Sequence, residues 1–362
     1  MQVAEAPATR EELGAALASA AEAGTPVRFR GAGTKQGWPP APPPDALELS
    51  TAGLNEIVEH NAGDLTAVLG PGVLLADAQA VFAKEGQRLA LDPPDLGATV
   101  GGVVASGDTG PLRGRYGGPR DLVVGMRVAL SDGTLAKSGG KVIKNVAGYD
   151  IAKLFTGSFG TLGAIVELSV RLHPIAPDTA TVLGEARDPD ELARAADALG
   201  RSALEHHGID VSWGGGRGRV LARFAGAAPR PQAEAAEKLL RAEEVAAEIV
   251  DEDDSLWDAQ RAAQRGPLVV KVSSLPTRLP QLVRAVEELG GSLVGRATLG
   301  LSWVRFDEPS AAAVERLRRE FIAVVLDRPA DLDVDPLGPM DPATRGLMQR
   351  VKERFDPAGV CV

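Results

Sequence analysis

Cysteine and histidine are scarce in this sequence of 362 residues. A single cysteine, Cys361, excludes an internal disulfide, a cysteine-based zinc site and an iron–sulfur cluster. The four histidines are His60, His173, His206 and His207. Neighbours in sequence point in different directions on a helix or a strand, so the pair at 206–207 is a poor metal site. We expect no bound metal.

Long apolar runs and an excess of positive charge are also absent. No segment approaches the roughly 20 apolar residues that a membrane-crossing helix needs. Residues 1–13 lack the basic segment and apolar core of a secretory signal. The formal net charge is -10, whereas nucleic-acid binding requires a basic face. We therefore expect a cytoplasmic protein with no nucleic-acid partner and no transmembrane segment.

The composition is that of a globular protein, with 44% hydrophobic and 24% charged residues. Its length is sufficient for two domains. Periodicity, turn residues and caps predict the following elements in the first part. Helices are expected at 9–23, 74–84 and 149–155, and strands at 27–30, 46–49, 56–59, 66–69, 122–130 and 164–172.

The pattern changes after about residue 176, where amphipathic helices alternate with short strands. Helices are expected at 189–199, 231–248, 277–289, 310–320 and 342–354, and strands near 179–184, 218–224, 267–272, 292–296, 300–306 and 322–326. Strand–helix–strand units of this kind suggest a sheet with helices on one face, similar to ferredoxin-like halves. We place a domain boundary near residue 176.

A loop of small residues follows the strand expected at 27–30. In residues 31–35, Gly-Ala-Gly-Thr-Lys, backbone N–H groups can approach an anion closely, and Thr34 and Lys35 add a hydroxyl and a charge. A pyrophosphate would fit such a loop, although a plain tight turn explains it equally well. The loop is neither a Rossmann fingerprint, since the third glycine is missing, nor a Walker loop.

Two further segments are rich in glycine. Residues 93–107 contain Gly101 and Gly102 inside an apolar run, where a flat ligand lying on the backbone would explain them better than a plain core. Residues 157–163 contain three glycines directly before the strand expected at 164–172. Each segment alone is also explained by ordinary turns that require glycine. Three such loops in about 170 residues favour a common ligand.

The order of these loops resembles the FAD-binding domain of the vanillyl-alcohol oxidase/PCMH superfamily. The resemblance covers roughly residues 10–176. It rests on residues 30–34, 70–73, 99–102, 115–118, 121–133 and 157–165. A closer resemblance is to the FAD-binding subunit of bacterial glycolate oxidases, the GlcE type. It rests on residues 110–113, 120–121, 141–150, 154–163 and 355–360. That family usually continues with Asn-Pro-Gly where this sequence has Cys361 and Val362, so we expect the last contact near the flavin to be altered.

The resemblance implies an α+β protein. Residues 1–176 would be a two-part PCMH-type FAD-binding domain, and 177–330 a ferredoxin-like α+β cap domain. Residues 331–362 would be a C-terminal segment returning to the flavin domain.

By resemblance, the loop at 31–35 would hold the pyrophosphate. Other residues would lie along the flavin and ribityl chain or near the adenine. The implied cofactor-binding residues are Gly31, Ala32, Gly33, Thr34, Lys35, Pro94, Thr99, Gly101, Gly102, Ser106, Gly110, Gly160, Gly163 and Ile165. Backbone donors would supply most of this binding.

Missing histidines limit the chemistry. Many relatives attach FAD through His or Cys, but the first domain has only His60 and His173, outside the glycine loops. Noncovalent FAD follows. Oxidation of a 2-hydroxy acid needs a base and a cation, and relatives use a histidine-rich motif in the second half, where this sequence has only 206–207. No catalytic residue is identified. Arg217, Arg219, Arg223 and Arg296 could each bind a carboxylate, and none stands out.

The resemblance implies a subunit of a glycolate oxidase, which converts glycolate to glyoxylate. Its partners would be a homologous FAD-linked catalytic subunit and an iron–sulfur subunit. The complex could hold the chain at the periphery of the inner membrane. Two alternatives stay open. One is a self-contained FAD-dependent oxidoreductase of another hydroxy acid or alcohol. The other is a non-enzymatic scaffold with a degenerate FAD pocket.

Overall fold

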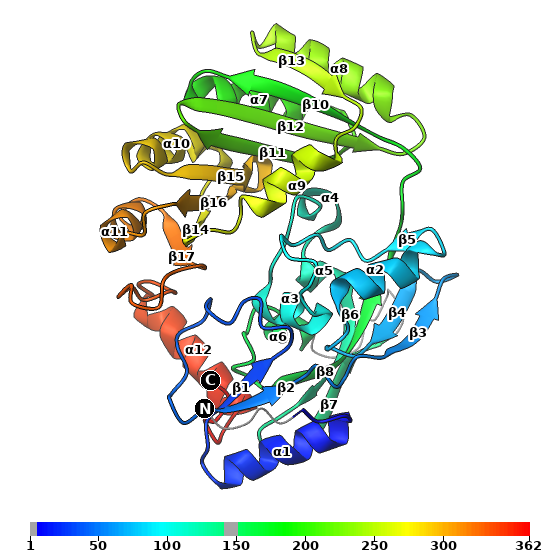
Figure 1. Ribbon diagram of the computed structural model, residues 1–362, viewed down its shortest axis with the longest axis vertical. Coiled ribbons are helices and arrows are strands. Elements are labelled where there is room, and N and C mark those ends of the chain that lie inside the picture. The colour runs from blue at the N-terminus through cyan, green and yellow to red at the C-terminus, as the bar shows by residue number, and fades with distance from the viewer. Residues whose placement is uncertain (1–5, 141–150) are drawn as a thin grey trace.

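The computed structural model of the chain describes residues 6–140 and 151–362. Two lobes are visible in Figure 1. The first lobe runs from α1 to β9, and the second lobe runs from β10 to β17. The last helix, α12 (Pro342–Phe355), leads back to the first lobe.

The first lobe is built on a five-stranded antiparallel sheet with the order β3-β4-β8-β6-β7. Its elements are α1 (Arg10–Glu22), β1 (Val27–Arg30), β2 (Leu47–Ser50), β3 (Ile57–Asn61), β4 (Thr66–Leu69), α2 (Leu75–Ala83), β5 (Gln87–Arg88), α3 (Val100–Ser106), α4 (Arg113–Tyr116), α5 (Pro119–Leu122), β6 (Val123–Ala129), β7 (Leu135–Gly139), α6 (Ala152–Phe155), β8 (Ala164–Arg171) and β9 (His173–Pro174).

Both faces of this sheet are covered. Ile165 of β8 packs in a cluster with Phe82 of α2 and Val103 of α3. The next residue, Val166, packs in a separate cluster with Leu13 of α1. The predicted capping box of α1 is confirmed, with the Thr9 hydroxyl accepting the Glu12 N–H and the Glu12 carboxylate accepting the Thr9 N–H.

The C-terminal segment lies beside β1, at the edge of the parallel β1–β2 pair. The Val27 N–H donates to the Val360 carbonyl at 2.6 Å, and the Val362 N–H donates to the Val27 carbonyl at 2.9 Å. Cys361 is buried between these two bonds. The end of the chain therefore extends the strand pair that leads into the loop at 31–35.

The second lobe is an eight-stranded antiparallel sheet with the order β13-β10-β12-β11-β15-β16-β14-β17. Its elements are β10 (Thr179–Ala186), α7 (Pro189–Arg201), β11 (His206–Gly214), β12 (Arg217–Ala225), α8 (Pro229–Ala242), β13 (Ala246–Val250), α9 (Asp254–Ala262), β14 (Leu268–Ser273), α10 (Leu279–Glu288), β15 (Ser292–Arg296), β16 (Leu301–Phe306), α11 (Ala311–Arg318) and β17 (Ile322–Val325).

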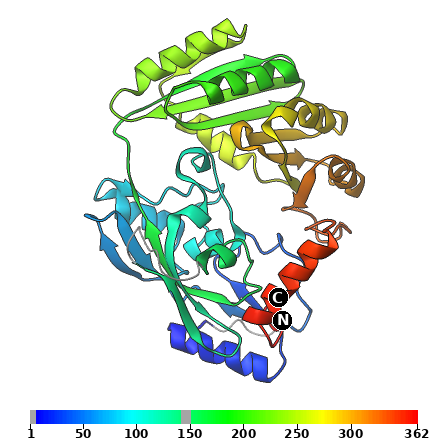
Figure 2. The same ribbon diagram turned by 180° about the vertical axis from the view of Figure 1, so that it is seen from behind.

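This sheet consists of two runs with the element order β-α-β-β-α-β. Within the first run the strands lie in the order β13-β10-β12-β11, and the second run repeats that arrangement as β17-β14-β16-β15. The runs join through antiparallel pairing of β11 with β15. Helices α7, α8, α10 and α11 cover one face, as both views show (Figures 1 and 2).

The other face of the second sheet is directed toward the first lobe. In β14, Val270 and Val272 belong to the core under the helices. Val269 points to the opposite side and packs with Trp38 of the first lobe. Strand alternation therefore places Lys271, two residues after Val269, on the side that faces the first lobe.

Mixed helices and antiparallel sheets agree with the expected α+β class. One predicted helix was wrong in extent. The helix expected at 231–248 ends at Ala242, and Ala246–Val250 forms the edge strand β13. Glu244 lies between them with a φ of 64°, a left-handed conformation that no helix interior contains. Strand β11 and helices α3 and α9 were not predicted. Residues 149–150 of the expected helix at 149–155 lie outside the described part.

Candidate functional site

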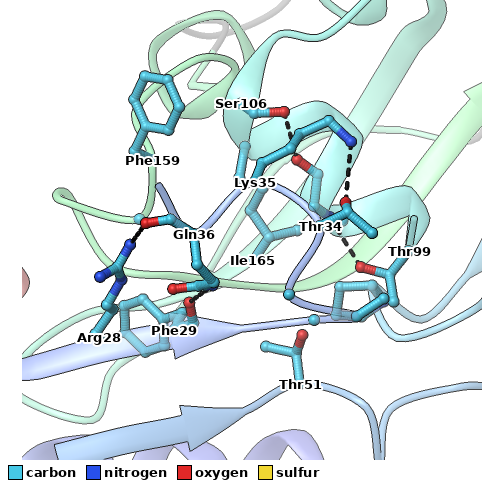
Figure 3. Close-up of a pocket in the computed structure, with 18 of the residues that line it drawn as sticks. Arg28, Phe29, Thr34, Lys35, Gln36, Thr51, Thr99, Ser106, Phe159 and Ile165 are labelled. Carbon is cyan, nitrogen blue, oxygen red and sulfur yellow. Dashed lines mark hydrogen bonds between the residues drawn. The ribbon is translucent and has the colours of Figure 1, made fainter. Parts of the chain in front are cut away.

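Three chain segments enclose a cavity in the first lobe (Figure 3). They are the loop after β1, helix α3 with the residue before it, and the loop between α6 and β8. The lining residues are Arg28, Phe29, Gly31, Ala32, Gly33, Thr34, Lys35, Gln36, Pro39, Thr51, Pro71, Thr99, Gly101, Gly102, Ala105, Ser106, Phe159, Gly160, Gly163 and Ile165. The three glycine-rich loops of the sequence therefore meet in space.

The loop after β1 is held against α3. A Cβ atom on Gly31 would lie 2.2 Å from the Thr99 Oγ1, so only glycine permits this approach. Gly33 has a φ of 79°, which turns the chain back over the cavity. Gln36 anchors the end of the loop, because its side-chain amide donates to the Phe29 carbonyl at 3.2 Å. The Arg28 guanidinium donates to the Gln36 carbonyl.

Helix α3 forms a second wall. The Thr99 side chain caps it by accepting the Gly102 N–H at 3.1 Å. A Cβ atom on Gly101 would lie 2.4 Å from the Pro71 Cβ, whereas one on Gly102 would meet only the Thr99 hydroxyl, at 3.0 Å. Gly101 is therefore explained by packing. Gly102 leaves the cavity side of the helix open.

The loop before β8 is bonded directly to α3. The Phe159 N–H donates to the Ala105 carbonyl at 2.8 Å, and the Gly157 N–H donates to the Val104 carbonyl at 3.0 Å. Phe159 adopts a positive φ of 54°, which is uncommon outside glycine. Gly160 has a φ of 81°, and a Cβ atom there would lie 2.8 Å from the Phe29 ring. The loop is thus locked onto both other walls.

The charge of the lining suits an anionic ligand. Its charged residues are Arg28 and Lys35, and no carboxylate lies among the described lining residues. The Lys35 ammonium is not free, because it pairs with the buried Asp108 carboxylate at 3.2 Å and contacts the Thr34 hydroxyl at 3.1 Å. Burial raises the pKa of Asp108, and the Lys35 charge opposes that shift.

These features together fit a dinucleotide. Six glycines line the cavity and expose backbone rather than side chains, and the hydroxyls of Thr34, Thr51, Thr99 and Ser106 add polar groups. A pyrophosphate requires backbone donors and positive charge, and the walls provide both. Phe29, Ile165 and Phe159 supply apolar surface for flat rings.

Most residues predicted for the cofactor line this cavity, but Pro94 and Gly110 do not. Pro94 is half-buried outside it. Gly110 has a packing explanation, because a Cβ atom there would overlap the Asp92 carbonyl oxygen at 1.7 Å. The motif at 141–150 lies outside the described residues.

Sequence reasoning also missed several lining residues. They are Arg28, Phe29, Gln36, Pro39, Thr51, Pro71, Ala105 and Phe159. Pro71 and Phe159 lie inside the motifs that carried the resemblance, and those motifs could have identified them. Thr51 and Pro39 carry no local signal, since their positions depend on strand pairing and on the second lobe.

The second lobe holds the loop after β1 from outside. The Trp38 indole N–H donates to the Asp327 Oδ1 at 2.8 Å, and the Arg265 Nε donates to the Asp327 Oδ2 at 2.7 Å. Arg265 also donates to the Thr34 carbonyl at 3.2 Å. Arg328 donates to the Gly37 carbonyl at 2.6 Å. We call Arg265, Asp327 and Arg328 the clamp.

No histidine lines the described cavity. The His60 ring bonds with the Gln87 Oε1 at 3.0 Å and packs against Phe82. His207 lies half-buried at the lobe interface, where its Nδ1 contacts the Tyr116 hydroxyl at 3.3 Å. Burial, then nearby arginines such as Arg115, lower its pKa to about 4.

The described residues contain neither a candidate metal cluster nor a candidate membrane span. Three or more His, Cys, Asp or Glu side chains nowhere gather within them in a way that could hold a metal ion. Among the helices of residues 6–140 and 151–362, none is both long enough and apolar enough to cross a membrane.

Comparisons with known proteins find relatives of part of the chain. Residues 1–139 match the model of the FAD binding domain family. Glycolate oxidase subunit GlcD of Bacillus subtilis is 37% identical over 180 residues, which is 49% of this chain and 38% of that protein. Glycolate oxidase subunit GlcE of Escherichia coli is 40% identical over 120 residues, which is 33% of this chain and 34% of that protein.

A solved structure covers more of the chain. Alkyldihydroxyacetonephosphate synthase superposes on 98% of this chain and 75% of its own, with a TM-score of 0.73 and 15% identity. At that identity the likeness concerns the fold alone. The alignments with the glycolate oxidase subunits span less than half the length of those proteins.

Proposed function

We propose that this chain, which carries an FAD-binding domain in residues 1–139 and uses FAD as its cofactor, is an FAD-dependent oxidoreductase subunit of a glycolate oxidase. Its complex would convert glycolate to glyoxylate. The homologous FAD-linked catalytic subunit would supply the base, and an iron–sulfur subunit would accept the electrons. FAD would be bound without a covalent link.

The cavity of the first lobe carries this proposal. Its three loops come from distant parts of the sequence and line one site. Hydrogen bonds join α3 to the loop before β8, and the loop after β1 approaches Thr99 closely at Gly31. The loop at 31–35 would hold the pyrophosphate, residues 99–106 would lie along the ribityl chain and the flavin, and residues 160–165 would lie near the adenine. FAD would supply the redox chemistry, and the chain would position it and exclude water.

Noncovalent attachment is supported by the composition of the walls, since the described lining contains neither histidine nor cysteine. Acid precipitation tests this point. Precipitated protein should be colourless, with all flavin in the supernatant. Flavin that stays with the denatured chain would contradict noncovalent binding.

Two observations support a partner subunit that supplies the catalytic base. The chain has only four histidines, and its relatives include subunits of glycolate oxidases. The test is to purify the chain alone and together with the products of its neighbouring genes, and to add glycolate anaerobically. We expect flavin bleaching in the complex and none in the lone chain. Bleaching of the lone chain would remove the division of labour.

A self-contained oxidoreductase of another hydroxy acid is the second candidate. In the described part of the second lobe, the buried Arg296 has two guanidinium nitrogens without a hydrogen-bond acceptor, and this cation favours it, because such an enzyme must bind a carboxylate. It predicts that a panel of 2-hydroxy acids contains one that bleaches the flavin of the lone chain.

We also propose the name ferredoxin-like for both halves of the second lobe, with residues 177–330 acting as a cap domain over the flavin. The repeated β-α-β-β-α-β order and the matching strand orders support this assignment. The parts 1–176 and 331–362 would then form the cofactor-binding unit together.

A further inference from the structure

Helix α12 is well formed but packs against little of the molecule. Both ribbon views show it at the outer edge, between the second lobe and the first (Figures 1 and 2). Its start is fixed locally, because the Asp341 carboxylate accepts the N–H groups of Ala343 and Thr344, both at 3.0 Å. None of its residues is buried. Isolated helices of about 12–15 residues are marginal in water, so a surface that covered α12 would stabilise it.

The apolar stripe of α12 is covered over only half its length. Helical period places Leu347, Met348, Val351 and Phe355 on one face. Val351 and Phe355 pack against the core of the first lobe, and the Phe355 ring meets the Phe155 ring edge-on with the centroids 5.6 Å apart. Leu347 and Met348 continue the stripe toward the start of the helix and are 55% and 51% exposed. Two large apolar side chains are therefore left in water.

Cations flank this uncovered part of the stripe on both sides. At about 100° per residue, Arg350 and Arg354 lie along one side, and Arg345 and Lys352 lie along the other. The three arginines are exposed, and their side chains form no hydrogen bond or ion pair with the described residues. Glu353 is the one carboxylate of the helix, in a chain whose formal net charge is -10. The helix is thus a basic element on an acidic protein.

The far end of α12 is joined to the cavity of the first lobe. The Lys352 ammonium donates to the Thr161 carbonyl at 2.7 Å. Thr161 lies in the loop before β8, between the lining residues Gly160 and Gly163. A protein seated on α12 would therefore lie next to a wall of that cavity.

We propose that α12 docks into an apolar groove rimmed by carboxylates on the homologous FAD-linked catalytic subunit. This inference rests on the proposed function, which requires such a subunit beside the chain. Charge complementarity carries the choice of occupant, since Arg345, Arg350 and Arg354 have no partner within the described chain and would each gain one at an acidic rim. Leu347 and Met348 would enter the groove. Because the helix is already formed, docking does not have to order it.

Two other occupants fit the charges less well. Pairing of α12 with its copy about a two-fold axis would bring the arginines of both helices together, and like charges repel. An anionic membrane would attract the helix but repel the acidic remainder of the chain, and two exposed apolar side chains give little insertion. Both occupants are outcomes that the experiment distinguishes.

Biolayer interferometry between the immobilised full-length chain and the purified FAD-linked subunit encoded beside it tests the proposal. We expect Leu347→Glu and Met348→Glu each to weaken binding about tenfold or more, since each places a carboxylate in the apolar groove. Leu275→Glu, at a side chain that is 68% exposed after β14, is the matched control and should bind like the unaltered chain.

A second pair of variants tests the charges. Arg350→Gln should weaken binding at low salt and make the affinity less sensitive to added salt. Arg319→Gln, at an exposed arginine that follows α11, should leave both the affinity and its salt dependence unchanged. Circular dichroism and the unfolding temperature of each variant confirm that the fold is kept.

Equal affinity in the α12 variants and the controls would overturn the inference and leave the proposed function standing. If the unaltered chain does not bind the FAD-linked subunit at all, the proposed function fails and the inference fails with it. A dimer of the unaltered chain that Leu347→Glu converts to a monomer in light scattering would assign the helix to a second copy. Binding to phosphatidylglycerol vesicles that Leu347→Glu abolishes, with unchanged affinity for the subunit, would assign it to a membrane. Either assignment would overturn the proposal.

Discussion

The clamp between the lobes should control both the stability of the chain and its affinity for FAD. Asp327 is the central residue, since its two oxygens accept the Trp38 indole N–H at 2.8 Å and the Arg265 Nε at 2.7 Å. Trp38 is 4% exposed, so water cannot replace the lost acceptor without opening the interface. We choose Asp327→Ala as the perturbation.

The magnitude follows from these contacts. An orphaned buried donor costs about 1–3 kcal/mol, and a hydrogen bond to a charged group contributes about 1.5–3 kcal/mol. The Arg265 side chain is 32% exposed and can recover part of its hydration, so we discount its share. We expect Asp327→Ala to lower the free energy of unfolding by about 3 kcal/mol. Trp38→Phe, which keeps the ring and removes the N–H, should cost about 1 kcal/mol.

FAD affinity should fall as well, because Arg265 also holds the Thr34 carbonyl in the loop that lines the cavity. In the variant, the loop after β1 would become ordered only when FAD binds, and the free energy of ordering it would weaken binding. An ordering cost of about 1.4 kcal/mol lowers FAD affinity tenfold. Urea denaturation of the FAD-free chain measures the first effect. Quenching of flavin fluorescence on titration measures the second.

A matched control separates the clamp from any loss of an aspartate. Asp307 pairs with Arg305 at 2.7 Å after β16, and its side chain is 78% exposed. Asp307→Ala should change stability by less than about 0.5 kcal/mol and leave FAD affinity unchanged. If Asp327→Ala behaves like Asp307→Ala in both measurements, the clamp does not restrain the loop and our reasoning is wrong.

Three further predictions follow from single residues. Gly31→Ala should lower the thermal unfolding temperature of the FAD-free chain, because the new Cβ would lie 2.2 Å from Thr99 Oγ1. Gly102→Leu should abolish FAD binding and leave that unfolding temperature nearly unchanged. The reverse pattern would refute our assignment of the cavity wall. Burial is the main cause that raises the pKa of Asp92 to about 7, so the folded state binds this proton more tightly than the unfolded state does. The free energy of unfolding should therefore fall as pH rises from about 4 to 7. Asp92→Asn should flatten this pH dependence in urea denaturation, and an unchanged slope would contradict the shift. Burial also raises the pKa of the Cys361 thiol to about 12, so iodoacetamide should label this residue only after unfolding. Rapid labelling of the native chain would contradict its burial beside β1.

Local signals predicted much of the fold. Strands β1 and β6 followed from short-range patterns that tertiary contacts did not override. The limits of α8 were not predictable in this way, because residues 243–248 continue the helical composition and only the conformation of Glu244 turns the chain. Strand β11 begins with two histidines and has a bulge, so its alternation is weak at the start.

The cavity of the first lobe was predictable because its walls are made of backbone. Gly31, Gly33 and Gly102 are visible in a sequence, since a missing side chain is itself the signal. The clamp was not predictable for the opposite reason. Nothing local distinguishes Asp327 from any other aspartate, and its contacts with Trp38 and Arg265 exist only once the two lobes face each other. Similarly, the sequence offers Arg217, Arg219, Arg223 and Arg296 on equal terms, and the structure shows that only Arg296 of the four is buried.

The glycines that line this cavity are present for two different physical reasons, and the structure distinguishes them. Gly31, Gly101 and Gly160 each prevent a collision between two parts of the chain, and such collisions would exclude a side chain whether or not a ligand is bound. These glycines bring the walls together, so they report on the construction of the cavity. Gly102 meets only the hydroxyl of its own helix cap and faces open space, so packing alone does not require it. A degenerate, non-binding pocket would retain the first group for stability and would be free to change the second, because alanine in a helix is more favourable than glycine by about 1 kcal/mol. The glycine at position 102 therefore argues for a ligand more strongly than the colliding glycines do.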